Sequence, residues 1–229
     1  GYAGDYGGDY AKGVTAAAEA NGLTVAWEYI VPSPEFDVAQ AVGLMVTKPV
    51  DAYFPAIGPT HMAQVAGGAF QQGLTPLSMM AAPSFNDAFV REGFALAPLF
   101  NSGSMYLMAF VAPYEAETTG HGVMRATLTS MGIDSANTFI VAGWASQHHL
   151  KGVLEAANKG GDLTRAGIRR AAGSVYVDSD GMMPTRELGQ NRADAESFVA
   201  VPDGTIASGV KLLAGNYVGP SAGGYDWES

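Results

Sequence analysis

The chain opens with GYAGDYGGDYAKG, residues 1–13, a glycine-rich segment with three tyrosines that runs straight into an alanine-rich stretch. The pattern predicts a loop over Gly4–Gly8 and a helix from about Asp9 to Asn21, because Asn21-Gly22 is a helix stop. A loop of this kind normally follows a buried strand, and none precedes it here. We therefore expect the chain to be the back portion of a longer protein.

The composition is typical of a globular protein. Of 229 residues, 48% are hydrophobic and 15% are charged, which suffices for a sizeable core in one large or two small domains. The net charge of −10 argues against nucleic acid as a partner, because phosphate binding needs clustered Lys and Arg. The absence of Cys excludes disulfides, thiolate catalysis and Cys-based zinc sites.

The first hundred residues alternate strand-like and helix-like segments. Their strands are continuously apolar, which is typical of a parallel sheet covered on both faces, and the alternation predicts an α/β fold. The expected strands are 23–31, 52–57, 77–82 and 94–99, and the expected later helices are 34–48 and 60–72.

After a candidate boundary at Asn101-Ser102-Gly103 the chain becomes mainly helical. Short strands and turns follow from Tyr176, and the tail from Gly215 is rich in Gly and Ser, which predicts poor order. Helices are expected at 104–111, 119–131, 145–159 and 163–172, with a single strand at 138–142.

Sequence motifs of catalysis are missing. There is no G-x-S-x-G, no G-x-G-x-x-G after a strand and no phosphate-binding G-x-x-x-x-G-K-[ST]. The adjacent His148 and His149 point about 100° apart on a helix and cannot share a metal. Residues 178–181 resemble the start of a calcium loop, but Gln190 stands roughly where its Glu belongs, so we expect a plain turn. We predict no catalytic residue, metal or cofactor.

Three predicted loops follow the carboxyl ends of strands, where ligands of open α/β sheets bind. They are 4–8, 58–60 and 81–84, and all are small, polar or aromatic and nearly uncharged. This suits a binding cleft with Tyr6 at its mouth better than a catalytic site, which would show paired titratable groups. Two other interpretations of the glycine-rich start are a tight turn without a ligand and a phosphate cradle, which Asp5 and Asp9 disfavour.

Several stretches together resemble the type I periplasmic binding proteins, and within them the leucine/isoleucine/valine-binding branch of ABC-transporter receptors. The likeness extends to about residue 200 and depends on the order and spacing of the motifs. They are Asp5-Tyr6-Gly7, Asn21-Gly22-Leu23-Thr24-Val25, Pro34-Glu35-Phe36-Asp37, the 69–75 segment AFQQGLT, the helix led by Gly143-Trp144, and Val177-Asp178-Ser179-Asp180-Gly181.

The resemblance implies two α/β lobes, each a parallel sheet between helix layers, that grip a ligand between them. Residues 1–100 would form the main part of the second lobe, and 104–180 the later part of the first lobe. Residues 184–229 would return to the second lobe and end in a flexible tail. The N-terminal part of the first lobe would be missing.

The resemblance also implies the ligand-binding residues Tyr6, Gly58, Pro59, Ala82, Pro83 and Trp144. Gly58-Pro59 matches a position that is often aromatic in the family. Ala82-Pro83 matches the place where amino-acid receptors put a carboxylate for the ligand's ammonium, and no acid stands there. Because a buried ammonium needs such a partner, this departure argues against a free amino acid as the ligand.

The implied function is that of a solute-binding receptor, not an enzyme. It would close on a small molecule by hinge motion and present it to the membrane permease of an ABC importer. We expect a periplasmic or extracytoplasmic location, with a lipid anchor as an option. The alternatives are an open-sheet α/β enzyme, either a hydrolase or a nucleotide-binding protein, and the ligand-binding domain of a sensory receptor.

Overall fold

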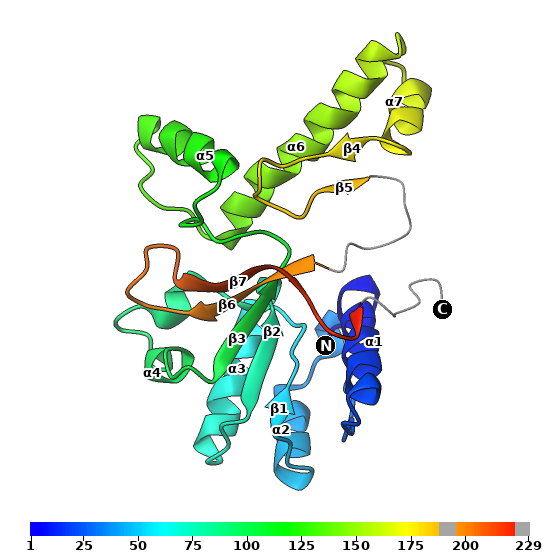
Figure 1. The fold of residues 1–229 in the computed structure, drawn as a ribbon. Coiled ribbons are helices and arrows are strands. Elements are labelled where there is room, and N and C mark those ends of the chain that lie inside the picture. The colour runs from blue at the N-terminus through cyan, green and yellow to red at the C-terminus, as the bar shows by residue number, and fades with distance from the viewer. Residues whose placement is uncertain (188–195, 223–229) are drawn as a thin grey trace.

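The computed structural model describes residues 1–187 and 196–222 and contains a five-stranded sheet in the order β1-β2-β3-β6-β7 (Figure 1). Strands β1 (Ala52–Tyr53), β2 (Leu77–Ala81) and β3 (Met105–Ala109) are parallel. Strands β6 (Glu196–Pro202) and β7 (Val210–Val218) extend the sheet in antiparallel fashion. The α/β class is confirmed, with a mixed sheet.

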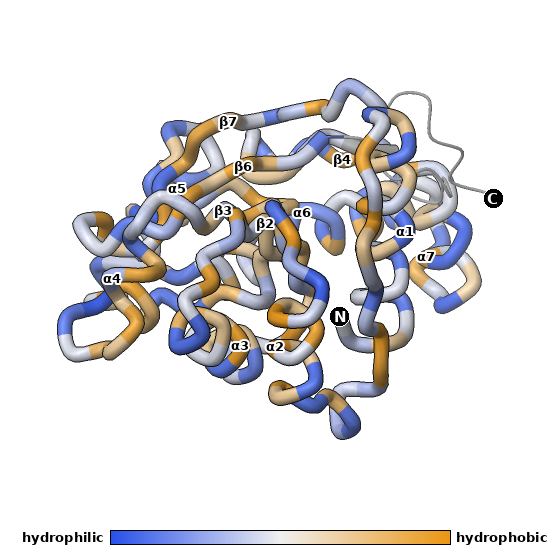
Figure 2. Tube along the Cα trace, turned by 90° about the horizontal axis from the view of Figure 1, so that it is seen from below, coloured by the Kyte–Doolittle hydropathy of each residue, from blue (hydrophilic) through white to orange (hydrophobic). Residues whose placement is uncertain are grey.

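Helices cover this sheet. α2 (Val38–Thr47) and α3 (Pro59–Gln71) pack together below β2 and β3 (Figure 2), and α1 (Asp5–Ala20) lies beside the β1 end. Asp37 caps α2 by accepting hydrogen bonds from the backbone N–H groups of the first turn. Shorter elements are η1 (Ser33–Glu35), η2 (Ala82–Ser84), η3 (Asp87–Val90) and α4 (Ala97–Phe100).

A second group of elements stands above the sheet in Figure 1. It consists of α5 (Thr119–Ser130), α6 (Thr138–Lys159), α7 (Arg165–Ala172) and a small antiparallel pair, β4 (Tyr176–Val177) and β5 (Arg186–Glu187). We call residues 110–187 the helical unit, and residues 1–109 with 196–222 the sheet unit. The division into lobes at 1–100, 104–180 and 184–229 stays a prediction, and β3 lies in the sheet unit.

Each unit has its own core. In the sheet unit, Phe100 is fully buried and its ring contacts those of Phe89 and Phe94, at centroid distances of 4.8 and 6.3 Å. The helical unit has a smaller cluster around Met124 and Val141, both fully buried. A third, alanine-rich cluster joins the units, because Ala112 and Ala116 pack with Ala82, Ala109 and Phe198.

Several secondary-structure predictions are wrong. Residues 104–111 contain β3, not a helix, because burial alternates along Met105–Ala109 between two neighbouring strands that outweigh the helix propensity of Met, Leu and Ala. Residues 138–142 begin α6, because Asn137 caps the helix there. Residues 94–99 form a turn and most of α4 instead of a strand.

Further elements begin or end at residues other than those predicted. α1 begins at Asp5 rather than Asp9. The prediction of a strand over 23–31 is wrong, because the segment pairs with a neighbouring segment only at one bridge, between Val31 and Tyr2. The tail prediction is wrong up to Val218, the end of β7, and residues 223–229 lie outside the described residues.

Candidate ligand-binding site

The carboxyl ends of β1 and β2 and the start of α1 meet at one edge of the sheet. Ser84 joins them: its Oγ accepts a hydrogen bond from the N–H of Ile57 at 3.2 Å and lies 3.4 Å from the carbonyl oxygen of Pro55. The hydroxyl of Tyr6 lies 3.3 Å from the same Oγ. The three loops that the sequence analysis singled out therefore converge through one buried serine.

Tyr6 lies in the first turn of α1, not in the loop predicted over Gly4–Gly8. Gly4 has φ 97° and forms the turn before the helix. Gly7 is required by packing, because a Cβ there would lie 2.0 Å from the carbonyl oxygen of Tyr2. The helix thus begins early, since glycine permits both the turn and the close approach. The Tyr6 side chain remains 37% exposed at the rim of the site.

Gly58 and Pro59 begin α3 as its N-cap and first residue. A Cβ on Gly58 would lie 3.0 Å from the hydroxyl oxygen of Tyr2, so glycine leaves room for that ring. The Tyr2 hydroxyl is 2.6 Å from Nδ1 of His61. Phe36 stacks on the His61 ring at a centroid distance of 5.0 Å, so aromatic rings occur beside this loop although the loop itself has none.

Ala82 and Pro83 form the start of η2, directly after β2. Ala82 is buried against the alanine-rich cluster that includes Phe198, and Pro83 is half-buried. The nearest acid after them is Asp87, the first residue of η3. Trp144 lies elsewhere: it is on α6 and packs against the core of the helical unit. Five of the six expected residues thus lie in the strand-end loops and α1, and Trp144 does not.

Burial raises the pKa of two phenols at this edge, those of Tyr6 and Tyr10. Desolvation raises the pKa of Tyr6, and the hydrogen bond with Ser84 opposes this only in part. Burial also raises the pKa of Tyr10, whose hydroxyl donates to the carbonyl oxygen of Met79 at 2.7 Å. The edge therefore offers neutral hydroxyls and rings to a ligand rather than charges.

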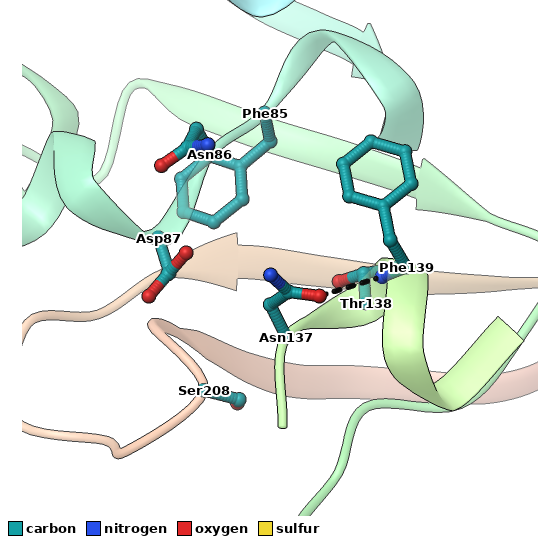
Figure 3. Close-up of a pocket in the computed structure, with 7 residues that line it drawn as sticks. All are labelled: Phe85, Asn86, Asp87, Asn137, Thr138, Phe139 and Ser208. Carbon is teal, nitrogen blue, oxygen red and sulfur yellow. Dashed lines mark hydrogen bonds between the residues drawn. The ribbon is translucent and has the colours of Figure 1, made fainter. Parts of the chain in front are cut away.

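A small pocket lies between the two units, next to this edge. Figure 3 shows the side chains that line it, which come from the segment after η2, the start of α6 and the β6–β7 turn. They are Phe85, Asn86, Asp87, Asn137, Thr138, Phe139 and Ser208. The sequence analysis missed this group, because residues so far apart in the chain are brought together only by the packing of the units.

Neither a metal cluster nor a membrane-spanning helix is found in the described part of the chain. Within residues 1–187 and 196–222, no group of three or more His, Asp or Glu side chains is arranged to hold a metal ion. The same residues contain no helix that is long and apolar enough to cross a membrane.

Solved structures with the same fold were found, whereas no protein-family model and no curated protein matches the chain significantly. A fatty acid ABC transporter substrate-binding protein from Thermomonospora curvata matches with a TM-score of 0.85 and 22% sequence identity, over 98% of this chain and 57% of that protein. A branched chain amino acid ABC transporter from Thermus thermophilus, with bound valine, matches with a TM-score of 0.67 and 13% identity, over 96% and 60%.

A leucine binding protein from Thermotoga maritima gives a TM-score of 0.65 and 14% identity, over 92% of this chain and 57% of that one. The chain thus spans less than two thirds of the length of these structures. They are type I periplasmic binding proteins of ABC transporters, which bind substrates and are not enzymes. The fold expected from the sequence motifs is confirmed.

Proposed function

We propose that the chain is the ligand-gripping part of a solute-binding receptor, which captures a small molecule and delivers it to the permease of an ABC importer. The observation that carries this proposal is the convergence of the strand-end loops at Ser84, beside Tyr6 and below the helical unit. Neutral hydroxyls, rings and small residues suit binding rather than reaction. The receptor would work outside the cytoplasm.

The ligand we propose is one that presents a neutral or apolar part to this edge. No carboxylate belongs to the loops at Gly58–Thr60 and Ala81–Ser84, so an ammonium group would be buried without a partner there. Amides, short-chain organic acids and aromatic compounds fit better than free amino acids. Leucine, isoleucine and valine would bind weakly or not at all.

A thermal-shift screen of the intact protein against a panel of small solutes tests the function. A ligand that binds only the native state raises the melting temperature by mass action, by about 2.7 kcal/mol of stability at a hundredfold excess over Kd. We expect a hit among neutral or acidic solutes. A panel without any hit, or hits confined to nucleotides, would contradict the receptor function.

Tyr6→Ala then tests the site. Loss of the ring should weaken binding of the hit by about 1–3 kcal/mol, as for an aromatic contact. It should hardly change the melting temperature without ligand, because the ring is partly exposed. Tyr176→Ala is the matched control, at a tyrosine that is 69% exposed in the helical unit. A large loss of stability with unchanged affinity would make Tyr6 a packing residue.

Calorimetry with free amino acids tests the ligand class. Micromolar binding of leucine, isoleucine or valine, abolished by Asp5→Asn or Asp87→Asn, would show that one of these acids reaches the ligand's ammonium. The proposal of a neutral ligand face would then be wrong, while the receptor function itself would stand.

A further inference from the structure

The pocket between the units holds two amide groups that still have hydrogen atoms to donate. Asn137 uses its Oδ1 to cap α6, accepting from the N–H groups of Phe139 and Ile140 at 3.1 Å each. This cap fixes the amide so that its nitrogen is turned toward Asp87 (Figure 3). Asn86 likewise uses Oδ1 for the N–H of Ala88 at 2.9 Å. Among residues 1–187 and 196–222, neither NH2 group has a hydrogen-bond partner, so both can donate to a ligand.

Asp87 supplies an acceptor that lies beside a cation. Its carboxylate lies 3.9 Å from the guanidinium of Arg91, too far for a strong hydrogen bond. Arg91 gives its N–H groups to backbone carbonyl oxygens of the β6–β7 turn, among them that of Ile206 at 3.0 Å. The carboxylate therefore keeps its lone pairs, while the nearby cation lowers its attraction for a second positive charge. The advantage of an ammonium over a neutral donor is therefore smaller here than at an unpaired carboxylate.

The size and walls of the pocket indicate which chemical group fits between Asp87 and Asn137. Its atom-free space of about 220 Å³ includes open solvent, and the room within it suffices for a group about the size of one water molecule. The rings of Phe85 and Phe139 flank the polar groups (Figure 3). A hydroxyl group has the right size, donates to a carboxylate and accepts from an amide. The rings would cover the carbon atoms that carry it.

We propose that this pocket is a subsite for a hydroxyl group on a compact, uncharged ligand. The inference rests on the proposed receptor function, because the walls come from both units and a ligand held here would bridge them. It narrows the ligand to hydroxylated neutral molecules, with Asp87 as acceptor and Asn137 as donor.

Ligand-observed NMR titration of the intact protein tests the subsite with three probes of similar size. These are propane-1,2-diol, the ether dimethoxymethane, which is an isomer of the diol without a hydroxyl group, and propylammonium. The ether cannot donate to Asp87, so the diol should bind at least about tenfold more tightly than the ether. Propylammonium should bind no better than the ether. Equal binding of diol and ether, no binding of the diol, or preference for propylammonium would overturn the proposal.

Two variants locate the binding. Asn137→Ser keeps a good helix cap but removes the amide donor, and it should weaken diol binding at least about fivefold without changing the helix content. Asn158→Ser makes the same substitution at an exposed position near the end of the same helix and should change nothing. Unaltered diol binding by Asn137→Ser would also overturn the subsite.

The two proposals fail in distinguishable ways. If Tyr6→Ala weakens binding of a solute from the thermal screen but Asn137→Ser leaves diol binding unchanged, the receptor function stands and the subsite is wrong. If no solute raises the melting temperature, the receptor function is wrong, and the subsite as a part of it falls as well.

Discussion

The sheet unit and the helical unit use their apolar residues differently. In the sheet unit, α2 and α3 pack against each other and against the strands. Ile57, Met62 and Met80 are therefore almost completely inaccessible to solvent. In the helical unit, α6 buries Val141 and Ala145 on one face only. Another face, which we call the bare face of α6, carries Ile140, Leu150 and Leu154, which are 38–54% exposed.

This difference shows that the apolar pattern of a helix does not reveal how many of its faces are packed against other elements. α6 has apolar residues around most of its circumference, which is typical of a helix packed on more than one side. Its small core and its bare face make the helical unit the less stabilised part of the molecule. Mutations in the two units should therefore have unequal effects.

The largest effect is expected in the core of the sheet unit. Phe100→Ala removes a fully buried ring that contacts Phe89 and Phe94, and it should lower the free energy of unfolding by about 3–5 kcal/mol. Met124→Ala in the helical unit should cost less, because its cluster is smaller. Urea denaturation measures both. A larger loss for Met124→Ala would reverse the comparison.

The bare face of α6 should cause self-association. Exposed apolar surface of this extent is typical of an interaction face, and Leu150→Gln with Leu154→Gln removes two of its side chains. We expect the association constant of the isolated chain to fall by about tenfold or more, measured by sedimentation equilibrium. Lys151→Gln, exposed on the same helix, is the control. A wild-type chain that runs as a compact monomer would contradict the expectation.

Acid should weaken the helical unit selectively. His121 is fully buried in α5, with Nδ1 2.8 Å from the Thr118 hydroxyl and Nε2 3.2 Å from the carbonyl oxygen of Ala112. Desolvation lowers its pKa below the ordinary 6.5, against the smaller opposing effect of the Ala112 hydrogen bond. The folded state thus favours the neutral ring, so its contribution to stability is present above pH 6.5 and is lost as pH falls below it.

Melting curves between pH 8 and 5 check this, with His121→Asn as the comparison. The variant should be less stable at pH 8 but should lose less of its remaining stability on acidification. Parallel losses in both proteins would assign the pH effect to other groups.

The smallest effect concerns an exposed ion pair on α6. Lys151 and Glu155 are 3.8 Å apart and their side chains are 72% and 68% exposed. Because solvent and salt screen such pairs, Glu155→Gln should change the free energy of unfolding by less than about 0.5 kcal/mol. A loss above about 1 kcal/mol would mean that this ion pair stabilises α6 more than solvent screening allows.

The elements that could be predicted from the sequence are those that short local patterns determine. β2 and α3 follow from an apolar run and from Gly73, whose φ of 74° ends the helix turn. The meeting of the loops at Ser84, beside Tyr6, follows from the rule that ligand-binding loops lie at the carboxyl ends of parallel strands. β3 was missed because its residues favour helices and only its neighbours make it a strand. The pocket at Asp87 and Asn137 depends on how the two units pack, which no local pattern encodes.

The order of strands in the sheet has a consequence for how the chain is made. β6 lies beside β3 (Figure 1), yet residues 110–195 separate them. During synthesis the ribosome therefore delivers all of α5, α6 and α7 before the strand that pairs with β3. Closing so long a loop is entropically costly unless the intervening helices have already become compact. We expect β3 to stay an open edge in the nascent chain, and hence to be the stretch that a chaperone must shield.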